Sequence, residues 1–127
     1  MTSGTGNECR YCRRIYNLKY MRKFRVENRE YIRRIDRESR QKLKLACLVV
    51  YGGENPKCEC CEEKENKFLS IDHIGGGGTK HREKIKMYGS RFYQWLKNNN
   101  FPKGFRVLCH NCNFALGHYE YCPHKNI

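Results

Sequence analysis

The chain has 127 residues, of which 26 are lysine or arginine and 13 are aspartate or glutamate, so its formal net charge is +13. This length favours one domain with an appended arm, and so small a core gains stability when the fold also binds a metal. The charge predicts a polyanionic partner, with nucleic acid favoured over an anionic membrane surface. The longest apolar run, Leu45 to Tyr51, is too short to span a bilayer, so no membrane partner is expected.

The nine cysteines indicate both a compartment and a metal. The first residues are polar and lack the features of a signal peptide, so we expect a cytoplasmic protein. In a reducing cytoplasm, Cys-x-x-Cys pairs indicate metal ligands rather than disulfides, and an odd number of cysteines fits a closed disulfide set poorly.

The first such pair is Cys9 and Cys12. Two thiolates at this spacing can bind one zinc ion, but a structural zinc site needs four ligands. Cys122 and His124, near the other end of the chain, would complete a second zinc site if the two ends meet. The alternative is that these residues are unrelated reduced pairs, or the remnant of a longer finger.

The segment from Arg13 to Tyr51 is predicted to be one long helix. It contains no proline or glycine and many good helix formers, and Gly52 and Gly53 follow it. Between Arg10 and Lys44, fourteen basic and four acidic residues give a net charge of +10. Guanidinium groups on a helix can bind successive phosphates of DNA. The arginines predicted to do so are Arg29, Arg33, Arg34, Arg37 and Arg40.

An apolar stripe runs along the second half of this helix. Its residues recur at steps of three and four: Ile32, Ile35, Ser39, Leu43, Ala46, Cys47 and Val50. The stripe either packs on the rest of the protein, with Cys47 as a small core residue, or forms a homodimer. The oligomeric state, monomer or homodimer, stays open.

Residues 54–127 are predicted to form an α+β domain behind the basic arm of residues 1–53. Strands are predicted at 68–71 and 105–108, followed by a small helix at 113–116. Zinc bound by four thiolates has no open coordination position, so any chemistry must come from other residues. The complete set of four thiolates, which suits a structural zinc ion, is Cys58, Cys61, Cys109 and Cys112.

The segment between these two cysteine pairs contains a run of four glycines, Gly75 to Gly78. We expect a flexible connector, with close approach of the backbone to DNA as the alternative. His81 and Arg82 follow in a basic stretch and are candidates for contact with phosphate, and His81 also for metal binding. The alternative is that His81 is a surface residue of a basic loop. A helix from Ser90 is predicted to turn Phe92 and its neighbours toward the core.

Asp72 and His73 stand at the end of the first predicted strand, where the chain can bend both side chains toward one site. A carboxylate suits a hard cation such as Mg²⁺, and a neutral imidazole accepts a proton from water near neutral pH. Asn113 adds an amide oxygen from the start of the last helix. Phosphodiester hydrolysis needs such a cation and such a base.

The blocks Ile71-Asp72-His73-Ile74 and Leu108-Cys109-His110-Asn111-Cys112-Asn113 resemble the HNH endonucleases of the ββα-metal class. The likeness is to small phage-encoded members with a four-cysteine zinc, which would function in the bacterial host cytoplasm. The last block is also similar to phage junction-resolving endonucleases. The resemblance implies a ββα-metal core in which Asp72 and Asn113 bind one Mg²⁺ or Mn²⁺ and His73 is the general base.

One position departs from that family, in which an asparagine that orients the histidine stands five residues before the third zinc cysteine. Gly104 occupies this position here. One of Asn98 to Asn100, or a backbone carbonyl, could substitute. The sequence thus predicts a metal-dependent DNA endonuclease or nickase. The alternatives are a junction-resolving nuclease, a non-catalytic zinc module that binds nucleic acid, and a subunit whose arm docks an acidic protein.

Overall fold

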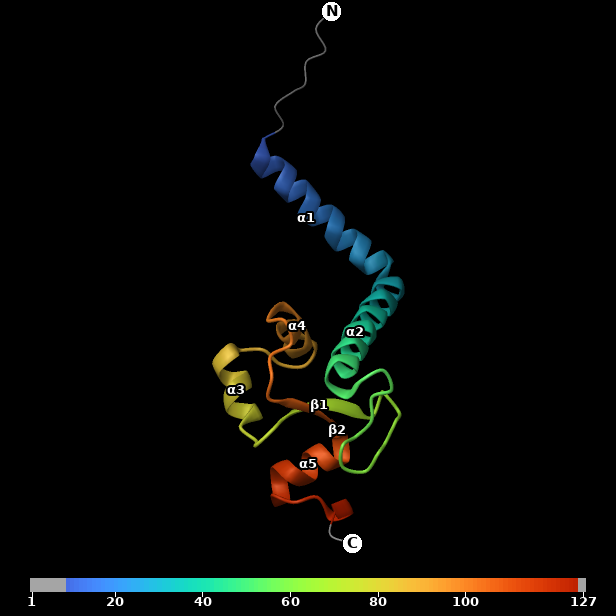
Figure 1. The fold of residues 1–127 in the computed structure, drawn as a ribbon. Coiled ribbons are helices and arrows are strands. Elements are labelled where there is room, and N and C mark those ends of the chain that lie inside the picture. Colours follow the sequence, from blue (N-terminus) through green and yellow to red (C-terminus); the bar gives the residue numbers. More distant parts are fainter. Residues whose placement is uncertain (1–8, 126–127) are drawn as a thin grey trace, which may run out of the picture. The chain divides into compact units, whose positions relative to one another are not determined.

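The computed structural model describes residues 9–125, which form an α+β protein of two compact units, one ending at Glu38 and the other beginning at Ser39. No helix within residues 9–125 is long and apolar enough to cross a membrane. The elements labelled in Figure 1 are α1 Arg10–Glu27, α2 Arg29–Gly52, β1 Leu69–His73, α3 Gly78–Ile85, α4 Ser90–Asn98, β2 Phe105–Cys109 and α5 His110–Tyr119, followed by the short 3-10 helix η1 Pro123–Lys125.

The arm contains two helices, so the prediction of one helix from Arg13 to Tyr51 was wrong at Asn28. The backbone N–H and the side-chain Nδ2 of Asn28 both donate to the carbonyl oxygen of Phe24, at 2.9 and 3.0 Å. An asparagine side chain bonded to a nearby carbonyl competes with the regular helical pattern. The first helix therefore ends at Glu27, and the second begins at Arg29.

The two strands form an antiparallel pair in which Leu69 lies opposite Cys109 and His73 lies opposite Phe105. Both predicted strands are confirmed to within two residues. The residues between them contain α3 and α4, whereas α5 follows β2 without a loop (Figure 1). This α5 is longer than the predicted helix at 113–116, and α3 was not predicted.

The core of the second unit joins the sheet to α2, α4 and α5. Fully buried leucines come from three of these elements: Leu48 from α2, Leu69 and Leu108 from the strands, and Leu96 from α4. Such close packing on both strands holds β1 in a fixed position, and β1 carries Asp72 and His73 at its end.

The last turns of α2 belong to this core. Cys47 is fully buried, as predicted, but Ala46 and Val50 from the predicted stripe are exposed. Periodicity determines the spacing of a buried stripe, whereas its edges depend on which elements pack against it. The second compact unit accordingly begins at Ser39, inside α2.

Candidate active site and cysteine-rich metal sites

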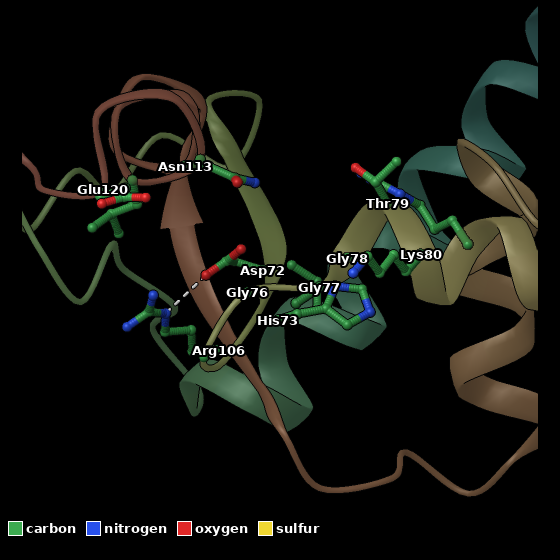
Figure 2. A pocket seen from close by; sticks show the side chains of 15 residues that line it. Asp72, His73, Gly76, Gly77, Gly78, Thr79, Lys80, Arg106, Asn113 and Glu120 are labelled. Atoms are coloured by element: carbon green, nitrogen blue, oxygen red, sulfur yellow. Dashed lines mark hydrogen bonds and ion pairs between the residues drawn. The ribbon is translucent and has the colours of Figure 1, made fainter.

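The end of β1, the glycine-rich loop behind it and α5 line a cavity of about 690 Å³. Asp72 and His73 reach it from the last two positions of β1, and Asn113 reaches it from the first turn of α5 (Figure 2). The fold therefore brings together the three residues to which the sequence assigned the chemistry.

Asp72 is held by an arginine from the neighbouring strand. Nε of Arg106 donates to Oδ2 of Asp72 at 2.9 Å, and the two residues lie opposite each other in the sheet register (Figure 2). Both side chains are half-buried, which limits the movement of the carboxylate. The ion pair uses Oδ2 and leaves Oδ1 available to a ligand in the cavity.

Asn113 is oriented by a chain of two hydrogen bonds through Ser70. The hydroxyl of Ser70 donates its single hydrogen to the carbonyl oxygen of Leu108 at 3.1 Å. Ser70 can therefore only accept from Asn113, whose Nδ2 lies 3.1 Å from Oγ of Ser70. The amide is thus fixed with its NH₂ group toward β1, which leaves Oδ1 available as an acceptor.

His73 is joined to a second histidine from α3. Nε2 of His73 lies 2.9 Å from Nδ1 of His81 in a hydrogen bond. The ring of His73 stacks on Phe92 and meets Phe105 edge-on, at centroid distances of 5.5 and 4.7 Å. His81 itself is partly buried and packs against Trp95, so it is not a surface residue of a basic loop.

The surroundings of His73 favour its neutral imidazole. Burial lowers the pKa of His73 below its ordinary value, and the positive charges of His81 and Arg82 lower it further, while Asp72 opposes the shift. A neutral imidazole has one nitrogen free to accept a proton. His73 is therefore suited to the role of a base rather than of a fixed cation.

The four glycines, which the sequence predicts to be a flexible connector, form the turn between β1 and α3. Gly75, Gly76 and Gly77 all have φ near +80°, a backbone conformation that other residues rarely adopt. Gly78 begins α3 and lies directly against the ring of His73. A Cβ at position 78 would lie only 2.7 Å from Nδ1 of that histidine, so the close approach requires glycine. The loop therefore places α3, and with it His81, beside His73.

Basic side chains predominate among the charged residues around the cavity. Lys80, Arg82 and Arg106 line it together with the acidic Asp72 and Glu120. The arginines predicted to contact DNA have exposed side chains on α2: Arg29, Arg33, Arg34, Arg37 and Arg40. The position expected to carry an orienting asparagine, Gly104, has a φ of +101° and accepts a hydrogen bond from the N–H of Ile74 at 2.9 Å.

Asn98 and Asn99 bond within α4 instead of reaching His73. Oδ1 of Asn98 accepts from Gln94, and Nδ2 of Asn99 donates to the carbonyl oxygen of Trp95, both at 2.8 Å. Among the described residues, the side chain bonded to His73 is His81.

The predicted group of four cysteines could hold a metal ion such as zinc. The Sγ atoms of Cys58, Cys61, Cys109 and Cys112 lie within 4.8 Å of one another. The N–H of Glu59 donates to the carbonyl oxygen of Val107 at 3.0 Å and pins the first pair to β2. Burial opposes ionisation of Cys58, but hydrogen bonds from neighbouring backbone groups lower its pKa to about 7, which favours the thiolate that binds metal.

A second group also has the geometry of a metal site, and its members differ from the prediction. Cys122 and His124 lie within 4.8 Å of Cys60 and Cys112. The sequence had combined them with Cys9 and Cys12, which are exposed at the start of α1 in the other unit. The turn after α5 instead returns the end of the chain to the cysteines of the second unit.

Several contributors to these sites were not predicted from the sequence, among them Ser70, Cys60 and Arg106. The position of Ser70 could have been predicted from the sequence, because residues two apart in a strand share a face and Asp72 follows Ser70 at that spacing. Cys60 was set aside as a spare cysteine inside the first pair. Arg106 has no local signal, since its contact with Asp72 depends on the strand register.

In comparisons with known proteins, no protein-family model, no curated protein and no solved structure matches this chain. Its function is therefore inferred from its own residues and their geometry.

Proposed function

We propose that this protein is a metal-dependent DNA endonuclease or nickase, with its active site in the cavity between β1 and α5. One observation carries the proposal: Asp72, His73 and Asn113, from two separate segments, line one cavity to which Lys80 and Arg82 add positive charge. These groups are what phosphodiester hydrolysis requires, namely oxygen ligands for a cation, a base, and positive charge to receive the substrate.

Asp72 and Asn113 would hold one Mg²⁺ or Mn²⁺ ion. Carboxylate and amide oxygens are preferred ligands of hard cations, and Oδ1 of each residue is left available by the hydrogen bonds that orient it. Glu120 lines the same cavity and offers a further carboxylate. When bound, the ion would stabilise the negative charge that develops on the phosphate and the leaving oxygen.

His73 would act as the general base through Nδ1. Because His81 occupies Nε2, the nitrogen left to accept a proton from water is Nδ1. This role requires that Nε2 of His73 donate to Nδ1 of His81, since a neutral imidazole carries one N–H. His81 would thereby supply the orientation that the HNH resemblance assigns to an asparagine at the position of Gly104.

Basic residues would hold the DNA. Lys80 and Arg82 lie at the cavity, and the exposed arginines of α2 would bind further phosphates. Each phosphate neutralised releases counterions, so affinity should fall steeply as salt rises.

Replacing Arg33 and Arg37 by glutamine should lower the slope of log affinity against log salt by about 1 for each phosphate that is no longer neutralised.

The test is nicking of supercoiled plasmid with Mg²⁺, Mn²⁺ or EDTA. Wild type should nick with either cation, and His73→Ala should nick about 10²–10⁴-fold more slowly while it binds DNA equally well. Glu83→Ala, an exposed acidic residue of α3 outside the cavity, is the control. If neither cation supports nicking above the His73→Ala level while DNA still binds, the protein is a non-catalytic zinc module. Linear duplex and four-way junctions as substrates would distinguish a general nuclease from a junction-resolving one.

A further inference from the structure

We propose that the second unit binds two zinc ions in one dinuclear centre, with the thiolate of Cys112 bridging them. Within each of two sets, four ligand atoms lie within 4.8 Å of one another, and Cys112 belongs to both. A shared ligand is what a bridge requires. The sets are Cys58, Cys61, Cys109 and Cys112, and Cys60, Cys112, Cys122 and His124.

The spacing in both sets fits tetrahedral zinc. Bonds of about 2.3 Å to sulfur and about 2.0–2.1 Å to nitrogen place neighbouring ligand atoms of a tetrahedron about 3.5–3.8 Å apart. Nδ1 of His124 lies 3.2 Å from Sγ of Cys112 and 3.4 Å from Sγ of Cys122. In the first set, the Sγ atoms of Cys61 and Cys109 are 3.6 Å apart.

One zinc ion cannot engage both sets. A structural zinc ion takes four ligands, so an ion in the first set would leave Cys60, Cys122 and His124 as unused donors beside it. Charge favours a second ion as well. Two ions and six thiolates carry a net charge of −2, the same as one ion with four thiolates, because the second ion balances the thiolates of Cys60 and Cys122.

The path of the chain after α5 places Cys122 and His124 at this centre. Glu120 follows α5 in the left-handed conformation, with a φ of 66°. The chain then turns after α5 and continues into η1 (Figure 1). Cys122 is only 4% exposed. The dinuclear centre would thus fasten the C-terminal segment to the first turn of α5, which carries Asn113.

Zinc content of the purified full-length protein, measured by mass spectrometry, tests the number of ions. We expect two zinc ions per chain in wild type and one in Cys60→Ser, which leaves the first set complete. Two matched controls should keep both ions: Cys47→Ser, a buried cysteine outside both sets, and the double variant Cys9→Ser/Cys12→Ser. One ion in wild type, or loss of an ion from the Cys9→Ser/Cys12→Ser protein, overturns the proposal.

Substitution with ¹¹³Cd tests the bridge itself and requires no mutation. Two cadmium resonances split by coupling to each other are expected, because a shared thiolate connects the nuclei through bonds. Two resonances without mutual splitting would show separate sites and overturn the bridge. The two ions belong to the scaffold, so their presence is independent of whether the protein cleaves DNA.

Discussion

The two ends of the β1–β2 pair carry different chemistry. At one end, Leu69 faces Cys109 and sulfur ligands gather; at the other, His73 faces Phe105 and oxygen and nitrogen groups line a cavity. A rise of about 3.3 Å per residue separates the two ends by about 13 Å. The same short sheet therefore supports two sites that do not share ligands.

The difference in burial agrees with the roles proposed for the two ends. Cys58, Cys109 and Cys112 are buried, as befits a closed metal site that stabilises a fold. Asp72 and His73 are only half-buried, and a site that is to receive a substrate must stay open. We call the end of the strand pair with the cysteines the closed end and the end with the cavity the open end. The closed end also fixes the start of α5, and thus the position of Asn113 relative to the open end.

Breaking the closed end should have the largest effect. Cys109→Ser should abolish the cooperative thermal unfolding of the second unit, and nicking with it. Structural zinc contributes about 10–16 kcal/mol in small zinc domains, which is as large as the typical stability of about 5–15 kcal/mol of a whole protein. Circular dichroism melting measures this, with Cys9→Ser/Cys12→Ser as the control that melts like wild type. If Cys109→Ser melted like wild type, the proposal that Cys109 holds a structural metal ion would be wrong.

At the open end, Gly78→Ala should slow nicking by about 100-fold, because the new Cβ would lie 2.7 Å from Nδ1 of His73 and displace the ring. The fold should persist, since the closed end is untouched. Nicking rates beside melting curves check this, with Glu83→Ala on the same helix as the control. A Gly78→Ala enzyme with the wild-type rate would show that Nδ1 of His73 is not the base.

Ser70→Ala tests the connection between the two ends, since Ser70 orients Asn113 from the middle of β1. Loss of an outer-shell partner typically weakens metal binding about 10–100-fold. The Mg²⁺ concentration for half-maximal nicking should therefore rise by about tenfold or more, with most of the rate restored at saturation. An unchanged Mg²⁺ requirement would mean that Asn113 does not bind the ion.

His81→Ala should have the smallest effect, most visible at acid pH. His73 must be neutral to act as a base, and burial is the main cause that lowers its pKa. Removing the ring of His81 exposes His73 to water and reduces that burial, so the pKa rises and the acid limb of the pH–rate profile moves to higher pH. On that limb, the rate falls about tenfold for every pH unit by which the pKa of His73 rises. His81→Asn, which keeps a polar atom near Nε2 of His73, should restore part of the wild-type pH–rate profile. If the acid limb of His81→Ala did not move, His81 would have no influence on the pKa of His73.

Local patterns in the sequence were enough for the parts of the sites that lie close together in the chain. The spacing of Cys58 and Cys61, and of Cys109 and Cys112, predicted the first metal group, which the structure assembles. The break at Asn28 was also a local feature, yet helix propensity alone does not reveal a side chain that bonds back to a carbonyl.

The sequence by itself determined the two strands, the cysteine pairs and the position of Asp72 and His73 at a strand end, because each depends on neighbours within a few residues. Only the tertiary structure brought His81 to His73, and Cys122 and His124 to Cys60 and Cys112. These contacts join segments whose approach depends on the turn at Gly75 to Gly78 and on the turn after α5. No residue pattern encodes such contacts alone, since they follow from how α3 and the C-terminal segment pack on the sheet and its helix.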